Sequence, residues 1–412
     1  GPNFGIVEAT IALHTVFNSP VDHIVYDVSH QTYPHKMLTG RKQAYMDPAL
    51  YDSVSPYTDP AETPHDLFKI GHTSTSISLA LGLAKARDIM GGKENIIAVI
   101  GDGSMSGGEA LEGLNVAGEL NSNFIIVFND NQMSIAENHG GMYDQFAELR
   151  RTNGAAENNL FKSMGLDYLY VNDGNDIEAL IVAFEQVKDT THPVVVHINT
   201  LKGKGYAPAE ANKERWHWHM PFDIQTGQSP ASGSSESYAS IFAEYALKRA
   251  KTDSKFLVLM SAVPGLLGLT QERREELGKH YLDVGIAEET AVAMASGAAH
   301  AGAHVVWGSS ATFIQRTYDQ LTQDLALNQN PAVIVGSGSI RGLMAATHQG
   351  LSSISMIANI PNMVYLAPSN AEEYIAMLDW ALDQDKHPVY IAIPSGPVVH
   401  AEGPVRTNFD DL

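Results

Sequence analysis

Apolar and polar positions alternate in blocks along the first half of the chain. Short runs rich in β-branched residues are separated by longer amphipathic stretches, the pattern typical of α/β domains with parallel sheets. The apolar runs predict strands at HIVYDV (23–28), NIIAVIG (95–101), NFIIVFND (123–130) and PVVVHIN (193–199). The amphipathic stretches predict helices over residues 73–90 and 176–189. We therefore expect a mainly parallel sheet flanked by helices in this half.

The pattern is interrupted once and then resumes. The segment DIQTGQSPASGSSES (223–237) is rich in Gly, Ser and Pro and predicts a linker. Beyond it, apolar runs predict strands at 256–262, 303–309, 331–338, 363–369 and 388–395, with helix-like stretches over 288–302 and 370–385. The expected organisation is two α/β domains, residues 1–222 and 238–400, followed by a connector at 401–412.

Composition narrows the class of protein. The 412 residues contain 26 Lys and Arg against 47 Asp and Glu, and the net charge of −21 argues against binding to nucleic acid or an anionic membrane. Because the sequence has no cysteine, disulfides and thiolate metal sites are excluded. No apolar run reaches the roughly 18 residues of a membrane span, and no signal peptide is recognisable, so we expect a cytoplasmic protein. The chain begins with Gly1 rather than Met, so we expect its natural N-terminus to lie upstream.

Polar side chains follow two neighbouring strands of the first predicted sheet. Asp102 stands between two glycines at the end of one strand, and Asn131 follows the next strand. Because the carboxyl ends of parallel strands meet at one edge of a sheet, we expect the two side chains to lie close together. With a backbone carbonyl, for which Met133 is the candidate, they would leave octahedral positions of Mg²⁺ open for diphosphate oxygens. Singly, each also fits an ordinary turn; as a pair they predict a metal-bridged phosphate site.

Several further segments share one resemblance. They are DVSHQTYPHKMLTGR (27–41), GHTSTSIS (71–78), NDNQMSI (129–135), KGKGYAPAE (202–210), DVGIAEE (283–289), TFIQRTYDQ (312–320) and ATHQG (346–350). In this order, and over nearly the whole chain, they resemble the 1-deoxy-D-xylulose-5-phosphate synthase family of the transketolase superfamily. The resemblance implies two thiamine-diphosphate-binding domains, thiamine diphosphate and Mg²⁺ as cofactors, and a homodimer. It implies that pyruvate is decarboxylated and its two-carbon unit joined to glyceraldehyde 3-phosphate or a related aldehyde.

The resemblance also assigns roles to residues of the first domain. Asp102, Asn131 and Met133 would ligate Mg²⁺. The implied cofactor-binding residues of this domain are His30, Gly71, His72, Thr73, Gly103, Ser104, Asn131 and Tyr206. Of these, Tyr206 would close over the cofactor and His30 would also be catalytic. A further histidine would precede Gly1, and a third domain would follow Leu412.

In the second domain the resemblance implies three functional residues. Glu288 would hydrogen-bond the pyrimidine ring of the cofactor and favour the imino tautomer, whose nitrogen removes the thiazolium proton. Phe313 would stack on the pyrimidine, and His348 would exchange a proton with the reacting carbonyl. The cofactor would therefore span both domains. Taken alone, Glu288 also suits the first turn of a helix, and Phe313 suits a hydrophobic core.

Four positions in the implied sugar-phosphate pocket depart from the family pattern. Ser337 and Ser395 stand where the family has arginines, Met344 stands where it has an acidic residue, and Ser310 where it has a tyrosine. An arginine fork binds phosphate through two charged hydrogen bonds, whereas serine offers one neutral hydroxyl. The departures therefore support an alternative, in which the acceptor is a different aldehyde or ketose, unphosphorylated or differently charged.

Other interpretations of the sequence stay open. Arg341 is a candidate replacement for the lost phosphate anchors. The segment between Asn138 and Leu160 is shorter than the mobile loop of the family. The cluster WHWHMP (216–221) predicts a lid or packing segment rather than a metal site, and Arg150-Arg151 predicts solvated surface. A cofactor-binding scaffold without turnover and a component of a 2-oxo-acid dehydrogenase are the two alternative classes of function.

Overall fold

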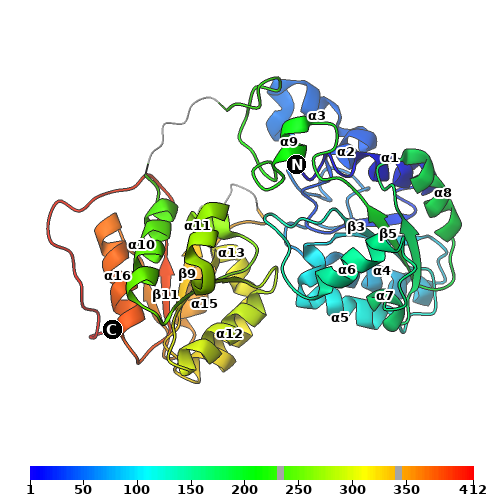
Figure 1. Ribbon diagram of the computed structural model, residues 1–412. Helices are drawn as coiled ribbons and strands as arrows, with labels where there is room; N and C mark the ends of the chain where they lie inside the picture. The colour runs from blue at the N-terminus through cyan, green and yellow to red at the C-terminus, as the bar shows by residue number, and fades with distance from the viewer. Residues whose placement is uncertain (230–235, 339–345) are drawn as a thin grey trace. The chain divides into compact units, whose positions relative to one another are not determined.

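The structure is a computed structural model and describes residues 1–229, 236–338 and 346–412 (Figure 1). The chain divides into two compact units, Gly1–Pro230 and Ala231–Leu412. This boundary falls inside the segment 223–237, for which the sequence predicts a linker. Each unit is an α/β domain built on a parallel sheet, so the predicted fold class is confirmed.

The first unit contains a five-stranded sheet in the order β1-β2-β3-β5-β4, and all neighbouring strands run parallel. The strands are β1 (His23–Tyr26), β2 (Ile96–Gly101), β3 (Ile125–Asp130), β4 (Asp167–Val171) and β5 (Val194–Asn199). The α-helices are α1 (Val7–Val16), α2 (Tyr33–Lys36), α3 (Gln43–Met46), α4 (Ser76–Met90), α5 (Gly108–Ala117), α6 (Met142–Arg151), α7 (Leu160–Ser163), α8 (Ile177–Val187) and α9 (Ala207–Ala211). Short 3-10 and π segments are η1 (Met37–Arg41), η2 (Pro48–Ser53) and η3 (Ser104–Ser106).

Helices cover both faces of this sheet (Figure 1). Successive residues of a strand point to opposite faces, and β2 divides its side chains accordingly. Ile96, Ala98 and Ile100 pack in one core with residues of α4 and α5. Ile97 and Val99 pack in a second core with residues of α1 and α8. Strands covered on both faces need continuous apolar runs, which explains why the sequence pattern locates β2 and β3 so clearly.

The second unit contains a six-stranded parallel sheet in the order β10-β11-β9-β8-β6-β7. The strands are β6 (Phe256–Met260), β7 (Tyr281–Asp283), β8 (His304–Ser310), β9 (Val333–Ser337), β10 (Val364–Leu366) and β11 (Val389–Ala392). The α-helices are α10 (Tyr238–Thr252), α11 (Gln271–Leu277), α12 (Glu288–His300), α13 (Ala311–Ile314), α14 (Tyr318–Gln320), α15 (Ser353–Ala358) and α16 (Ala371–Asp383). The remaining short segments are η4 (Pro264–Leu267), η5 (Gly278–His280), η6 (Gln315–Thr317) and η7 (Leu321–Ala326). Trp307, Ile334 and Tyr390 belong to a core that α12 helps to cover.

The apolar pattern misses two strands, β4 and β7. Both occupy an outer position of their sheet, where a strand has a neighbour on one side only. Most residues of β4 are half-buried or exposed, and β7 is three residues long. Neither strand therefore needs the long apolar run by which a central strand is recognised.

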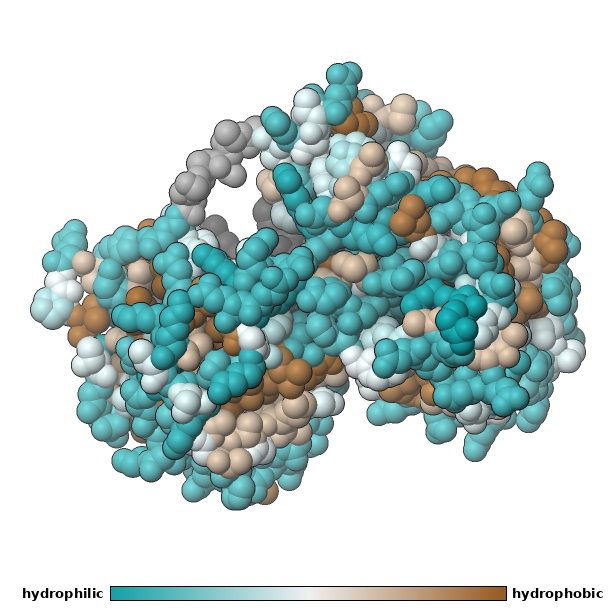
Figure 2. Space-filling model, in the orientation of Figure 1, coloured by the Kyte–Doolittle hydropathy of each residue, from teal (hydrophilic) through white to brown (hydrophobic). Residues whose placement is uncertain are grey.

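The surface is predominantly hydrophilic on the face that Figure 2 presents, in keeping with the large excess of acidic residues. Across the three described ranges, every helix is too short or too polar to cross a membrane.

Candidate active site

The carboxyl edge of the first sheet brings Asp102 and Asn131 together. Asp102 follows β2, and its backbone N–H donates to the carbonyl oxygen of Asn129 at 3.1 Å, which extends the pairing of β2 with β3. The backbone N–H of Asn131 donates to the Asp102 carboxylate. The parallel register of β2 and β3 thus determines this contact, as expected from the order of the strands.

Asp102 carries a carboxylate in an unfavourable environment. The residue is 1% exposed, and its Oδ2 accepts a hydrogen bond of 2.7 Å from the Asn138 amide. Burial, followed by repulsion from the charge of Asp130, raises the pKa of Asp102 to about 7. Asn138 and the positive charge of Lys202 act in the opposite direction but do not cancel the increase. A bound cation would stabilise the ionised carboxylate at this position.

Asn131 supplies the second oxygen of the predicted metal site. Its Oδ1 atom is buried, and among the described residues no group donates a hydrogen bond to it. A buried amide oxygen without a partner costs about 1–3 kcal/mol unless something else binds it. Met133, the third predicted ligand, lies in the following turn, which an antiparallel bridge from Met133 to Glu137 closes. Because oxygen atoms are the ligands that Mg²⁺ prefers, these residues fit the predicted ion.

Gly103 precedes η3, and Ser104 is the first residue of η3. A Cβ atom at Gly103 would lie 3.0 Å from Cα, Cβ and Oγ of Ser134, so only glycine fits without a shift of the metal-site turn. The carbonyl oxygen of Ser104 accepts a hydrogen bond of 2.8 Å from Oγ of Ser74. This bond connects the β2 edge to the predicted cofactor-binding turn at Gly71, His72 and Thr73.

Asp27 holds that turn in place, and the sequence motifs did not single it out. Its carboxylate is 1% exposed and accepts hydrogen bonds from the backbone N–H groups of Ser74, at 2.8 Å, and Ser76, at 2.9 Å. Ser74 has a positive φ of 77°, a strained conformation for a residue other than glycine, and these bonds help to maintain it. The available signal was a carboxylate at the end of an apolar run, the same signal that identified Asp102.

His30 and Tyr206 lie in aromatic surroundings. The His30 ring lies 5.1 Å from the ring of His217, and Tyr206 contacts the rings of Phe4, Trp216 and Phe222 at 6.1, 5.1 and 5.8 Å. His219 stacks on Trp216 with ring centroids 4.3 Å apart. The cluster at 216–221 therefore packs against predicted site residues. Within the described part of the chain, no group of three His, Asp or Glu side chains is arranged to hold a metal.

Lys202 is a further buried charge at this edge. It is 2% exposed, and its Nζ donates to the backbone carbonyl oxygen of Ser134. Burial lowers the pKa of Lys202 to about 8, although the charge of Asp102 partly opposes the decrease. The sequence placed Lys202 in a matched motif without giving it a role. The sequence feature that could have identified Lys202 is its position shortly after a central apolar strand.

Arg150 corrects the expectation that Arg150-Arg151 is solvated surface. Nη1 of Arg150 donates to Oδ2 of Asp130, which also accepts from Nε2 of His197 at 3.0 Å. Nδ1 of His197 is hydrogen-bonded to the Tyr168 hydroxyl at 2.7 Å. Burial alone would raise the pKa of Asp130, but its bonds to His197 and Arg150 outweigh burial and hold that pKa below its usual range. Arg151 is exposed and pairs with Glu148 three residues earlier, as the sequence predicts for surface.

In the second unit, Glu288 is the first residue of α12 and is 3% exposed. Burial raises the pKa of Glu288, and the charge of Arg316, whose Nη1 lies 3.4 Å from Oε2, opposes the increase. The rings of Phe313 and His348 meet edge to face with centroids 5.6 Å apart. Nδ1 of His348 is 2.9 Å from the hydroxyl of Thr347, and burial lowers the pKa of His348. The structure thus brings Phe313 and His348 together, with Glu288 and Arg316 as a second pair.

Comparisons with known proteins decide the family. Residues 1–158 and 152–200 match the family model of 1-deoxy-D-xylulose-5-phosphate synthase, and residues 236–398 match that of the transketolase pyrimidine-binding domain. The chain is 39% identical to the 1-deoxy-D-xylulose-5-phosphate synthase of Pelotomaculum thermopropionicum over 92% of this chain and 65% of that protein. It is 38% identical to the synthase of Desulforudis audaxviator and to synthase 1 of Geobacter sulfurreducens, in each case over 96% of this chain and 68% of the relative.

The chain belongs to the 1-deoxy-D-xylulose-5-phosphate synthase family. The resemblance inferred from the motifs is therefore confirmed, and so are its cofactors, because this family depends on thiamine diphosphate and Mg²⁺. The chain spans about two thirds of the length of these relatives, between 65% and 68%.

The four departures from the family pattern divide between described and undescribed residues. Ser310 and Ser337 end β8 and β9 and stand opposite each other in the parallel register. Ser395 is exposed just after β11. Met344 and Arg341 lie outside the described residues. Arg316 contacts Glu288, so its charge is already engaged.

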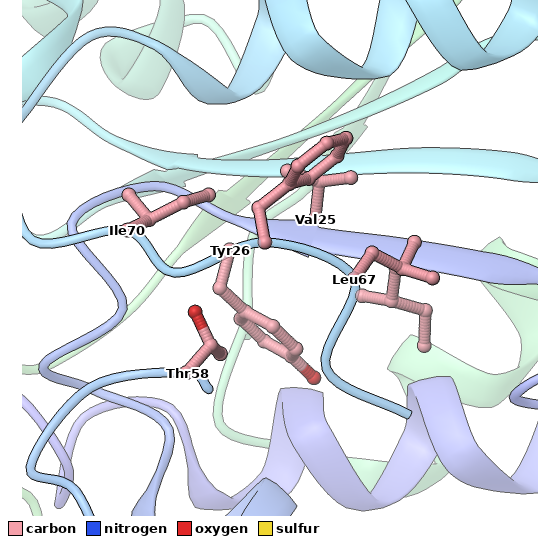
Figure 3. A pocket seen from close by; sticks show the side chains of 7 residues that line it. Val25, Tyr26, Thr58, Leu67 and Ile70 are labelled. Carbon is pink, nitrogen blue, oxygen red and sulfur yellow. The ribbon is translucent and has the colours of Figure 1, made fainter. Parts of the chain in front are cut away.

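A small cavity in the first unit lies apart from these residues (Figure 3). It is lined by Ile24, Val25, Tyr26, Thr58, Leu67, Phe68 and Ile70. None of the predicted cofactor or metal residues contributes to its wall, and mostly apolar side chains surround it. We therefore assign it to the packing of β1 against the segment 58–70.

Proposed function

We propose that this chain is part of a transferase that decarboxylates pyruvate and joins the two-carbon unit to glyceraldehyde 3-phosphate, forming 1-deoxy-D-xylulose 5-phosphate. The names of its relatives state the synthesis of this product. When bound, thiamine diphosphate supplies the carbanion chemistry for this reaction, and the protein supplies binding, orientation and electrostatics.

One observation supports the proposal most strongly: the unpartnered amide oxygen of Asn131 next to the buried carboxylate of Asp102. Both groups are unfavourable when buried alone, and both become favourable ligands when Mg²⁺ is present. The glycine at 103 also leaves room for close approach to the backbone. These features fit a metal that bridges the protein to a diphosphate.

The residues of the first unit would bind the cofactor tail. In this proposal Asp102, Asn131 and the carbonyl of Met133 hold Mg²⁺, and Gly103 and Ser104 contact the diphosphate. The turn at 71–73 and Tyr206 would line the same cofactor, and His30 would contact the reacting groups. Asp27 and Lys202 fix the turns that carry these residues, because each connects a loop of the edge to another part of it.

The residues of the second unit would act on the pyrimidine and the substrate. Burial raises the pKa of Glu288, and its carboxyl group would share a proton with a ring nitrogen of the cofactor. Phe313 offers an aromatic face. His348, whose pKa is lowered by burial, is neutral near pH 7 and can accept a proton from the substrate.

The proposal also covers the acceptor substrate and the oligomeric state of the protein. The comparisons favour glyceraldehyde 3-phosphate over the unphosphorylated acceptor that Ser337 and Ser395 suggest. A homodimer located in the cytoplasm is also part of the proposal, and sedimentation of the full-length protein tests the dimer.

The experiment measures pyruvate-dependent CO₂ release by the full-length protein with Mg²⁺ and thiamine diphosphate, with glyceraldehyde 3-phosphate or with glyceraldehyde as the acceptor. We expect turnover that requires both cofactors and is more efficient with the phosphorylated aldehyde. Calorimetry that detects no binding of thiamine diphosphate with Mg²⁺ present would contradict the proposal. Turnover with glyceraldehyde alone would retain the cofactor assignment and replace the acceptor.

A further inference from the structure

Gln31 connects His30 to the end of β1. The side chain of Gln31 is 8% exposed. Its Nε2 donates a hydrogen bond of 2.9 Å to the backbone carbonyl oxygen of Asp27. Its Oε1 lies 3.0 Å from Nδ1 of His30. One buried amide group therefore bridges a strand end and the imidazole that we assign to the reaction.

These two contacts determine which nitrogen of His30 carries the proton. A carbonyl oxygen only accepts hydrogen bonds, so the NH₂ group of Gln31 must face Asp27 and its Oε1 must face His30. Because Oε1 also only accepts, Nδ1 of His30 must be the donor. In a neutral imidazole the other nitrogen, Nε2, is then unprotonated and is the atom that accepts a proton.

The surrounding bonds hold both ends of the bridge in place. The carboxylate of Asp27 is fixed by two backbone N–H groups of the 74–76 turn, and its own N–H donates to the carbonyl oxygen of Val99 at 2.8 Å. On the other side, Asn3 binds the backbone of the turn: its Nδ2 donates to the His30 carbonyl and its Oδ1 accepts from the Tyr33 N–H, each at 3.0 Å.

We propose that Gln31 is a positioning residue that keeps His30 in the Nδ1–H tautomer, with Nε2 as its proton-accepting atom. This inference rests on the proposed function for the role of His30, but the tautomer itself is a property of the protein without cofactor. His348 differs in this respect. Its Nδ1 meets the hydroxyl of Thr347, which can donate or accept, so that contact does not select a tautomer.

The test reads the tautomer directly by NMR. The full-length protein is labelled with ¹⁵N- and ¹³C-histidine and studied without cofactor near pH 8, where an unperturbed imidazole is neutral. The His30 signals are identified by their loss in His30→Asn. We expect a protonated Nδ1 and an unprotonated Nε2 in the unmodified protein. Gln31→Met, which removes the acceptor at similar size, should lose this preference, whereas Gln31→Glu should keep it.

Turnover provides the second readout. We expect Gln31→Met to lower kcat by about 10²-fold with little change in KM, the lower end of what a misplaced general base costs. Gln31→Glu should stay within about 10-fold of the unmodified protein, because its carboxylate still accepts from Nδ1 although it no longer donates to the Asp27 carbonyl. The exposed Gln43 provides a matched control, Gln43→Met, which should change neither readout.

An Nε2–H tautomer in the unmodified protein would overturn the inference, and so would a tautomer that is unchanged in Gln31→Met. If Gln31→Met does not fold, the unmodified protein still overturns the inference should it show the Nε2–H tautomer. Absence of turnover in the unmodified protein would count against the proposed function and leave the tautomer result intact.

Discussion

The carboxyl edges of the two sheets carry side chains of different chemical character. In the first unit the strands end near buried charges, Asp27, Asp102 and Asp130, with Lys202 and Arg150 as counter-charges. In the second unit β8 and β9 end in the hydroxyls of Ser310 and Ser337, β7 ends in the buried Asp283, and the buried carboxylate of Glu288 begins the helix that follows β7. A metal with a diphosphate demands charged and oxygen ligands, whereas a flat heterocycle demands one proton-sharing carboxyl group and apolar contacts.

The two edges also share one structural feature. Asp27 of the first unit accepts hydrogen bonds from two backbone N–H groups, and Asp283 of the second unit does the same with those of Ala262 and Gly285, at 2.8 and 2.9 Å. In both units a buried aspartate thus fixes a loop at the strand ends. The difference between the edges lies in the groups that such loops present, and this comparison can be tested.

The largest effect is expected from Glu288→Gln. Glutamine retains a hydrogen bond but cannot exchange a proton, so kcat should fall by about 10²–10⁴-fold while the affinity for thiamine diphosphate changes much less. The neighbouring Glu289→Gln serves as the control. Steady-state kinetics and calorimetry on both variants measure the separation. A loss of affinity as large as the loss of kcat would contradict the role of the second edge in the chemistry.

Asp102→Asn should show the reverse separation. Removal of the charge should weaken the Mg²⁺-dependent binding of thiamine diphosphate by about 10–100-fold, the value of one or more charge-assisted contacts. Asp283→Asn is the matched variant at the other edge, where we expect loss of thermal stability but little change in affinity. Calorimetry and thermal melts distinguish the two. Equal affinity losses in both variants would show that the edges do not differ in this way.

Arg150→Met should destabilise the first unit by about 3 kcal/mol, because it leaves the Asp130 carboxylate buried without its main counter-charge. Arg151→Met, the adjacent exposed residue, should cost about 0.5 kcal/mol or less. Urea unfolding of each variant, monitored by hydrogen exchange in each unit, measures both losses of stability. Similar small costs for the two variants would restore the interpretation of this pair as solvated surface.

A further effect concerns the stability of the first unit in acid. Burial, and then repulsion from His35 and His65, lowers the pKa of His14 to about 4, and burial also lowers the pKa of His35. The folded state thus favours neutral rings. Their contribution to stability is complete above pH 6.5 and is lost as the pH falls toward 4, a change of about 1–3 kcal/mol after allowance for the partial exposure of His14.

His14→Gln should flatten this dependence, because glutamine can still donate to Nδ1 of His35 but does not titrate in this range. Hydrogen exchange at pH 7 and pH 5 would locate the effect in the first unit. An unaltered pH dependence in the variant would exclude His14 as its source.

Several features of the site follow from local pattern. The apolar runs locate the central strands because these are covered on both faces, and the strand order then brings Asp102 to Asn131. Gly103 and the carboxylate of Asp102 can be recognised in the sequence because they follow one of these apolar runs directly. The sequence assigned no role to Lys202 or Asp27, because a single polar residue after an apolar run is common. The partners of each residue lie far away in the sequence.

The sequence alone therefore determined the two α/β units, their parallel sheets, the family and its cofactors, because periodicity and ordered motifs are local properties of the chain. Tertiary structure decided the rest. The bond of Arg150 to Asp130 crosses 20 residues and that of His197 crosses 67, and the pKa of Asp102 depends on everything that excludes water around it. Desolvation and long-range hydrogen bonding act between segments that meet only after folding, so no pattern along the chain records them.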